Sequence, residues 1–207
     1  MKNMKILAAV LFMLFMVFGM MSSASADSIT YYFTSDHITD TYGKTGPFGE
    51  VVLTQDGSNV DFLVSLYDTG TKFVRTGAGD FMNFKFNALA DSIVVGDISG
   101  TGLTAATGVL KGDGTGDFKY GVYITGQDKG EEAGISGPIA FTVAGATIAE
   151  LTTYVNSASM IFAADVISGI NGKTGMIDAS VTTVPEPTTL LLLGFGLVGL
   201  AGLRRKL

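Results

Sequence analysis

The chain contains no cysteine, no tryptophan and a single histidine, His37. Without cysteine it cannot form disulfides, thiolate zinc sites, cysteine nucleophiles or CxxC redox centres. A Ser–His–Asp triad would have to use His37, and no Gly-x-Ser-x-Gly elbow accompanies it. Metal sites that need two histidines are also excluded. We therefore expect no catalytic residues, no metal site and no cofactor, and we interpret His37 as a surface residue.

Basic residues are also scarce between the two ends of the chain. Residues 27–184 contain 18 acidic and 8 basic side chains, which gives this part a net charge of about −10. Such a charge disfavours nucleic acid and anionic lipid as partners. At 158 residues this part has the usual size of one domain, and it can build a core without disulfides.

The N-terminal 26 residues have the three parts of a secretory signal peptide. Lys2 and Lys5 form the charged part, and an uncharged apolar run follows from residue 6 to residue 18. Ala24-Ser25-Ala26 supplies the small residues of a cleavage site, so the mature chain is predicted to begin at Asp27. The run is short for a membrane span and ends among serines.

The C-terminal end has the pattern of a membrane anchor. No charged residue occurs from Thr188 to Leu203, and Arg204, Arg205 and Lys206 follow directly. As a helix these 16 residues reach roughly 24 Å, against roughly 30 Å for the hydrocarbon core. Snorkelling of the basic side chains makes up the difference. By the positive-inside rule the basic end stays in the cytoplasm and the body lies outside.

The last 24 residues resemble a known sorting signal. Val184-Pro185-Glu186-Pro187, a glycine-bearing apolar run and the Arg-Arg-Lys end are similar to the PEP-CTERM signal of Gram-negative bacteria. The resemblance implies an exosortase substrate, in which Pro185, Glu186 and Pro187 are recognised before the helix is removed. The physics agrees, because two prolines present this segment as an extended peptide.

Two-residue alternation of apolar and polar side chains dominates residues 27–184. It predicts β-strands near residues 29–33, 50–54, 60–66, 82–86, 92–98, 103–110, 118–124, 139–143, 160–166 and 175–182. Turn signals lie at Asp56-Gly57-Ser58, Gly112-Asp113-Gly114 and Asn171-Gly172. We expect one core that contains Phe62, Phe84, Phe118, Tyr120, Phe141 and Phe162.

One short helix interrupts the strands. Thr147 and Glu150 form a capping box, and Ile148, Leu151 and Val155 recur at helical spacing. The predicted fold is all-β: an antiparallel β-sandwich of jelly-roll or immunoglobulin-like type with one short helix. The predicted domains are residues 1–26 (signal peptide), 27–183 (sandwich) and 184–207 (sorting signal).

The body also resembles a recurring domain of PEP-CTERM proteins that has no assigned activity. The resemblance rests on four segments, which are residues 72–79, 118–121, 137–143 and 162–166 with 172–175. It is looser than the resemblance of the sorting signal, and it implies no catalytic residues.

Few residues of the body suggest chemistry. A glycosidase carboxylate pair would come from Asp80, Asp117, Glu131, Glu132 or Asp165, with Glu131-Glu132 in a solvated, glycine-rich loop. Residues 112–117 could cradle Ca²⁺, but they lack the closing Glu of an EF-hand, so a hairpin turn is the preferred interpretation. Gly77-Ala78-Gly79 is not a phosphate loop, because no Lys-Ser/Thr follows it.

The sequence leaves three hypotheses for function. The leading one is a non-enzymatic exported surface or matrix protein of a Gram-negative bacterium, translocated by the Sec machinery, tethered to the inner membrane and released by an exosortase. The second is a carbohydrate-binding module for exopolysaccharide, which would use some of the seven tyrosines. The third is a glycoside hydrolase with a carboxylate pair.

Overall fold

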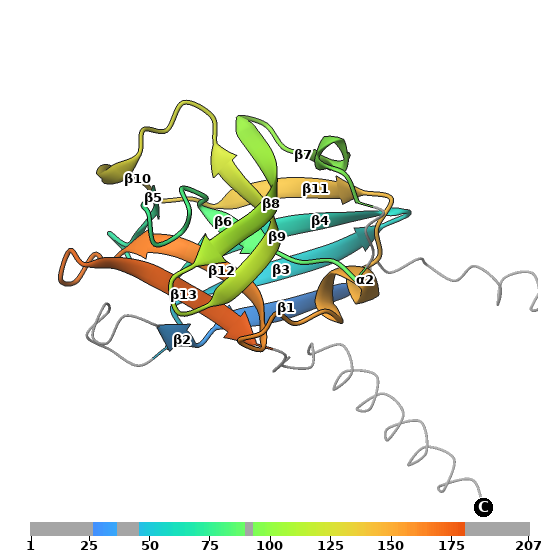
Figure 1. The fold of residues 1–207 in the computed structure, drawn as a ribbon, viewed down its shortest axis with the longest axis horizontal. Helices are drawn as coiled ribbons and strands as arrows, with labels where there is room; N and C mark the ends of the chain where they lie inside the picture. Colours follow the sequence, from blue (N-terminus) through green and yellow to red (C-terminus); the bar gives the residue numbers. More distant parts are fainter. Residues whose placement is uncertain (1–26, 37–45, 90–92, 181–207) are drawn as a thin grey trace, which may run out of the picture.

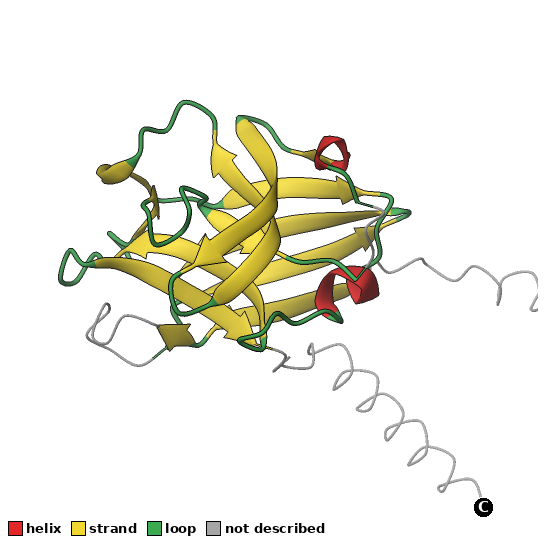
Figure 2. Cartoon of the chain, in the orientation of Figure 1, coloured by secondary structure: helices red, strands yellow, loops and turns green. Residues whose placement is uncertain are grey.

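The computed structural model describes residues 27–36, 46–89 and 93–180, all of which lie within the predicted body of residues 27–183. In these ranges the chain is mostly β-strand, with one 3-10 turn and one α-helix (Figure 2). The signal peptide, the sorting motif and the apolar C-terminal run all lie outside the described residues.

One antiparallel sheet, here called sheet A, lies behind the other in Figure 1. Its strand order is β1-β3-β4-β11-β7. The strands are β1 (Ser28–Phe33), β3 (Gly49–Asp56), β4 (Asn59–Leu66), β7 (Ile98–Ser99) and β11 (Ile139–Ala144). The turn Gly57-Ser58 joins β3 to β4, as the sequence predicted.

The second antiparallel sheet, sheet B, is built around β12 (Met160–Ile167). Along one edge of β12 runs β13 (Thr174–Ser180), which also pairs with β2 (Ser35–Asp36). Along the other edge β5 (Lys72–Arg75) and β6 (Phe84–Phe86) lie end to end. From β6 the sheet continues to β9 (Gly116–Ile124) and β8 (Leu103–Gly112), and from β5 to β10 (Gly130–Ile135).

The two sheets pack face to face around one apolar core. Phe62 of β4 stacks on Phe141 of β11, with ring centroids 4.5 Å apart. The same ring meets Phe84 and Phe162 of sheet B edge-on, at 6.2 and 5.9 Å. Aromatic pairs in these geometries add to the free energy gained by burying their area. The predicted arrangement of two packed antiparallel sheets is therefore present.

The predicted helix is also present, as α2 (Ile148–Thr152). Thr147 Oγ1 accepts the Glu150 N–H at 3.3 Å, and the Glu150 carboxylate accepts the Thr147 N–H at 2.8 Å. Leu151 is fully buried in the core, so α2 covers an end of the space between the sheets. The helix ends before Val155, which still packs against the same core.

The alternation pattern assigned some side chains and segments wrongly. Phe118 does not join the main core but packs with Ala163 and Met176 on the outer face of sheet B. The register between β8 and β9 shifts between Thr107 and Leu110, beside Phe118, and this shift breaks the alternation. The shift of β12 between Met160 and Phe162 likewise places Ile161 in the main core.

Other segments depart from the predicted strands. The strand expected over residues 92–98 is instead the 3-10 turn η1 (Val95–Asp97) followed by the two-residue β7. Residues 130–135, expected as a loop around Glu131 and Glu132, form β10. The short strand β5 has only four residues, too few for a clear alternation. The side chains of Glu131 and Glu132 are outside the described set.

Candidate functional site

Two places in the body gather polar side chains: the outer face of sheet B and the outer face of sheet A. On sheet B the chain between β5 and β6, here called the 76–83 loop, leaves the edge of β12 and returns to it. The buried Asn83 holds the end of this loop in place. Its side-chain amide donates to Val74 O at 2.9 Å and accepts the Ile124 N–H at 2.9 Å.

Asp165 of β12 lies buried beneath this loop. Its carboxylate accepts the Thr76 N–H at 2.6 Å and the Thr76 hydroxyl at 2.8 Å. The Gly79 N–H also donates to it. A Cβ at Gly79 would lie 2.5 Å from Asp165 Cβ, so only glycine lets the loop approach so closely. Asp165 therefore acts as the acceptor around which the loop is folded.

Lys85 of β6 is fully buried on the same face. Its ammonium donates to Lys111 O at 2.7 Å and lies 5.7 Å from the centroid of Phe118. A Cβ at Gly112 would lie 3.0 Å from Lys85 Nζ and 2.1 Å from Thr115 Oγ1, so the β8–β9 turn needs glycine there. The turn is joined to the 76–83 loop by the Asp113 N–H, which donates to Ala78 O at 2.9 Å.

Burial shifts the pKa of both charged groups toward neutrality. Desolvation raises the pKa of Asp165 to about 6, although the Thr76 hydrogen bonds and Lys85 oppose the shift. Desolvation lowers the pKa of Lys85 to about 8, although Asp165, Asp80 and Asp117 oppose it. Perturbed groups of this kind occur in active sites but also in structural networks. Here both side chains are buried and hydrogen-bonded to backbone groups of neighbouring segments.

The carboxylates singled out in the sequence are only partly brought together. Asp80, Asp117 and Asp165 surround Lys85, and Asp80 accepts the Lys111 N–H at 3.2 Å. The segment Gly112–Asp117 forms the end of the β8–β9 hairpin, which is the preferred interpretation of that motif. Among the described side chains no group of three or more His, Asp or Glu is placed to hold a metal ion. His37 lies outside the described residues.

On the outer face of sheet A a row of short polar side chains crosses all five strands. Directly paired positions run from Ser28 through Thr54, Asp61 and Thr142 to Ser99. At the strand spacing of a β-sheet this row is roughly 19 Å long. The Thr142 hydroxyl donates to Asp61 Oδ1 at 2.6 Å and orients the carboxylate. The sequence shows these residues, but only the register reveals that they form a row.

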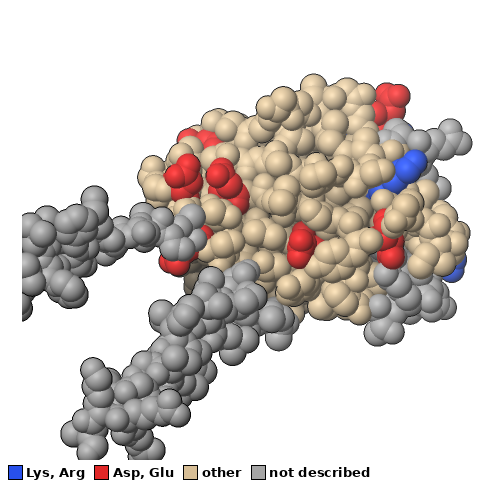
Figure 3. All heavy atoms as spheres, turned by 180° about the vertical axis from the view of Figure 1, so that it is seen from behind, with Lys and Arg blue, Asp and Glu red and all other residues tan. Residues whose placement is uncertain are grey.

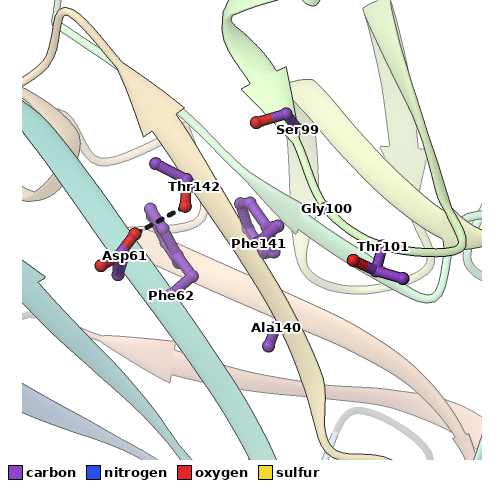
Figure 4. A pocket seen from close by; sticks show the side chains of 8 residues that line it. All are labelled: Asp61, Phe62, Ser99, Gly100, Thr101, Ala140, Phe141 and Thr142. Carbon is purple, nitrogen blue, oxygen red and sulfur yellow. Dashed lines mark hydrogen bonds between the residues drawn. The ribbon is translucent and has the colours of Figure 1, made fainter.

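The row ends in a depression of about 560 Å³ where β7 stops beside β11 (Figure 4). Its polar lining comes from Asp61, Ser99, Thr101 and Thr142, and Ala140 lies between them. Asp61 and Thr142 point toward one another across neighbouring strands in Figure 4. Hydroxyl and carboxylate groups at an open depression can exchange hydrogen bonds with a ligand that carries hydroxyl groups.

An apolar row runs beside the polar one. The paired residues Val52, Leu63 and Ala140 follow each other across β3, β4 and β11, and Leu63 is 41% exposed. Beyond them Tyr67 donates to Glu50 Oε2 at 2.7 Å. The view in Figure 3, from behind relative to Figure 1, shows a surface with few charged side chains. The tyrosines considered for sugar binding differ in exposure: Tyr31 and Tyr120 are buried, whereas Tyr67 is exposed.

The described part of the chain contains no helix with the length and apolar content that a membrane span requires. The predicted cleavage site Ala24–Ala26 and the motif Pro185-Glu186-Pro187 lie outside the described residues, so their geometry is not part of this structure. Asp27 is described, and its carbonyl accepts the Gln55 N–H at 2.8 Å. The predicted mature N-terminus therefore lies at the start of the folded body.

Comparison with known protein families gives a match at the C-terminal end of the chain. The family model described as the PEP-CTERM protein-sorting motif matches residues 183–206. No curated protein matches the chain, and no solved structure matches it either. The match covers the motif Pro185-Glu186-Pro187, the apolar run and the basic residues Arg204, Arg205 and Lys206. The chain is thus a mostly β protein that carries a PEP-CTERM protein-sorting motif at its C-terminal end.

Proposed function

We propose that this chain is an exported surface or matrix protein of a Gram-negative bacterium that an exosortase processes at its C-terminal end. The single observation that carries the proposal is the sorting motif at residues 183–206. The motif begins just after the last strand of the body, which ends at Ser180. A folded domain followed directly by a recognition motif and an apolar run is the order that such processing requires.

In this proposal the N-terminal end of the chain directs export and the C-terminal end anchors the protein in the membrane. The Sec machinery recognises the signal peptide, and cleavage after Ala26 leaves Asp27 as the first residue. The apolar run then holds the protein in the inner membrane, with Arg204, Arg205 and Lys206 in the cytoplasm and the body in the periplasm. Processing at the motif transfers the body to the cell surface or the exterior.

The body itself has no enzymatic role in this proposal. Tyr67, whose pKa is raised by burial and by its hydrogen bond to Glu50, keeps its proton. The other two groups with clearly shifted pKa values among the described residues, Asp165 (about 6) and Lys85 (about 8), are fully buried. Each is also engaged by backbone groups of the loops above it, at Thr76 and Lys111. These contacts support a structural use of the pair, in which the charges hold two glycine-rich loops against sheet B.

Replacement of Pro185-Glu186-Pro187 by three alanines tests the processing step. In a host with an active exosortase we expect the variant to be translocated and to remain in the membrane fraction, because the signal peptide and the apolar run are unchanged. Replacement of Val181-Thr182 by two alanines, outside the matched residues, is the control and should be released like the wild type. Equal release of the alanine-motif variant would contradict the proposal.

A second candidate function is binding of a neutral glycan on the outer face of sheet A. The observation that favours it is the polar row next to the apolar row Val52, Leu63 and Ala140. A sugar chain presents hydroxyl groups at its rims and C–H groups on its ring faces, so it can use both rows at once. Asp61 and Glu50 are acceptors, and β1, β3, β4, β7 and β11 carry no lysine or arginine.

A glycan array with neutral and anionic oligosaccharides, probed with the exported protein, tests this candidate. We expect neutral glycans to bind and anionic ones to be rejected, because carboxylates and not cations line the face. Asp61→Asn and Thr142→Val should both weaken binding, whereas Asp113→Asn in the β8–β9 turn of sheet B should not. Absence of binding to all neutral glycans, or equal binding by the Asp61 variant, would contradict it.

A further inference from the structure

The strand at one end of sheet B is open to another strand. Among the described residues β8 (Leu103–Gly112) forms its ladder with β9 alone. It has ten residues, and the stretch from Leu103 to Leu110 contains no charged residue and no proline. Thr107, Gly108 and Val109 are exposed, the last at 71%. An edge strand that is long, uncharged and exposed is a template for pairing with a further strand.

The other sheet edges in the described ranges are protected. β10 carries Glu131 and Glu132, and its register with β5 is irregular. β2 and β7 have two residues each, too few for an extended ladder. β1 is longer, but Thr30, Tyr31 and Phe33 are buried and the strand lies along β13. Charge, irregular register and short length are the usual devices against edge pairing, and β8 lacks them over its first five residues.

A bulge sets the length of the available segment. The register with β9 shifts between Thr107 and Leu110, and Gly108 has a φ of +141°. Glycine adopts such a φ without the strain that a side chain would bring. The regular part of the edge is therefore Leu103–Thr107, five residues that pair one to one with Ile124–Tyr120 of β9.

We propose that β8 pairs in antiparallel orientation with β8 of a second copy of this chain, so that sheet B continues across a two-fold axis. A second copy supplies an edge that is likewise uncharged and, among the described residues, pairs on one side only. Such a self-complementary contact is the commonest kind between identical subunits. The contact also rests on the proposed function, because copies tethered to one membrane have a raised effective concentration. A charged partner would find no complementary charge along Leu103–Thr107.

The side-chain alternation limits the register of this pairing, and a centre at Ala105 uses all five regular residues of the edge. Residues that oppose each other across the axis point to the same face, so the axis must pass through a residue and not between two. Leu103 and Ala105 are half-buried and pack against the main core. A centre at Ala105 places Leu103 opposite Thr107 of the other copy on this inner face. Thr104 then opposes Ala106 on the outer face.

Because the chain has no cysteine, single cysteines can report this contact without background. The full chain with Ala105→Cys, produced in a host without exosortase and oxidised in its membranes, should form a disulfide-linked dimer. Leu63→Cys on the outer face of sheet A is the matched control and should stay monomeric, although the membrane tether concentrates it equally. Equal cross-linking at both positions, or none at Ala105, would overturn the proposal.

A second pair of variants does not depend on cysteine at a half-buried position. A photo-cross-linking residue at Thr107 should trap the dimer of the otherwise unchanged chain. Ala106→Lys, which places a charge on the edge, should abolish that dimer. Leu63→Lys adds the same charge elsewhere and should leave the dimer unchanged. Dimer yield should rise with salt, because only repulsion between the acidic bodies opposes the contact.

Membrane fractionation separates this inference from the proposed function. If the chain is not held in the membrane of a host without exosortase, anchoring by the apolar run fails as a proposal, and the Ala105→Cys chain is then oxidised in solution at increasing concentration. Dimer that forms at Ala105 but not at Leu63 still supports the β8 contact. A chain that is tethered and shows no Ala105 dimer overturns the β8 contact alone.

Discussion

The two faces of sheet B are both buried, but different parts of the chain cover them. Sheet A covers the inner face, where Phe84 and Phe162 pack against Phe62. The 76–83 loop and the β8–β9 turn cover the outer face, where Lys85 and Asp165 are buried beside Phe118. A face covered by loops needs polar anchors, because loop backbone groups must find hydrogen-bond partners.

The largest difference between the two faces should appear when an aromatic ring is removed. Phe84→Ala on the inner face should cost about 3–5 kcal/mol of unfolding free energy, because its ring contacts four other phenylalanines that are held by both sheets. Phe118→Ala should also lower the melting temperature strongly. Its cost in unfolding free energy should be smaller, about 3 kcal/mol, because the loops that cover Phe118 can relax around the lost ring. Denaturant titration of both variants measures this.

Phe84→Ala should cost more unfolding free energy than Phe118→Ala. If Phe118→Ala changes the melting temperature by less than a degree, the outer face is not a packed layer. If it costs more than Phe84→Ala, the main core is not the principal source of stability.

The next effect concerns the charge that holds the 76–83 loop. Asp165→Ala removes the acceptor of the Thr76 N–H and hydroxyl and takes from the buried Lys85 the carboxylate that compensates its charge most strongly. Loss of one partner of a buried charge pair typically costs about 3–5 kcal/mol, and here Lys85 can lose its proton and reduce the cost. We expect about 2–3 kcal/mol, measured by thermal unfolding at pH 7. An unchanged melting temperature would show that the loop does not depend on Asp165.

The same pair predicts a dependence of stability on pH. Burial raises the pKa of Asp165 to about 6 in the folded state, so the folded state binds the proton more tightly than the unfolded state does. Its contribution to stability is therefore fully present below about pH 4 and is lost as pH rises to about 6, by about 3 kcal/mol. The difference in unfolding free energy between wild type and Asp165→Asn should fall over this window and stay flat from pH 6 to 7.

Lys85 should make stability depend on pH in the opposite direction. Burial lowers its pKa to about 8 in the folded state, so stability should rise with pH between about 8 and 10.5 relative to Lys85→Met. A difference curve that rises between pH 4 and 6 for Asp165, or falls above pH 8 for Lys85, would contradict the burial of these groups.

The smallest effect compares two glycines of the same loop. Gly79→Ala should cost about 1–3 kcal/mol, because the new Cβ would lie 2.5 Å from Asp165 Cβ and 2.7 Å from Oδ2. Gly77→Ala is the matched control, since no atom lies within 4 Å of its Cβ position, and it should change stability by less than about 0.5 kcal/mol. Equal costs for the two variants would mean that the loop does not approach Asp165 as closely as described.

The inner face could be predicted from the sequence because its physical rule is local. Phe62, Phe84 and Phe141 alternate with polar residues, and a face covered by a second sheet repeats every two residues. The capping box at Thr147 and Glu150 is local as well, and it is confirmed. Strand candidates with several alternating residues, such as residues 60–66, are confirmed in the same way.

The outer faces could not be predicted because they depend on register and on distant segments. Phe118 continues the alternation of Tyr120, yet a register shift of β8 on β9 places it in another cluster. Thr76 and Asp165 are 89 residues apart in sequence, and only the return of the chain to β12 joins them. The polar row from Ser28 to Ser99 needs four strand pairings before it exists.

The central claim is that the chain is exported and then processed at its PEP-CTERM motif, and mass spectrometry of both termini tests it most directly. Protein collected from a host with an active exosortase should begin at Asp27 and should lack Leu190–Leu207. The same protein from a host without the enzyme should keep its basic end. Wild-type protein that retains Arg204, Arg205 and Lys206 in the presence of active exosortase would contradict the account, because the segment would then be a plain membrane anchor.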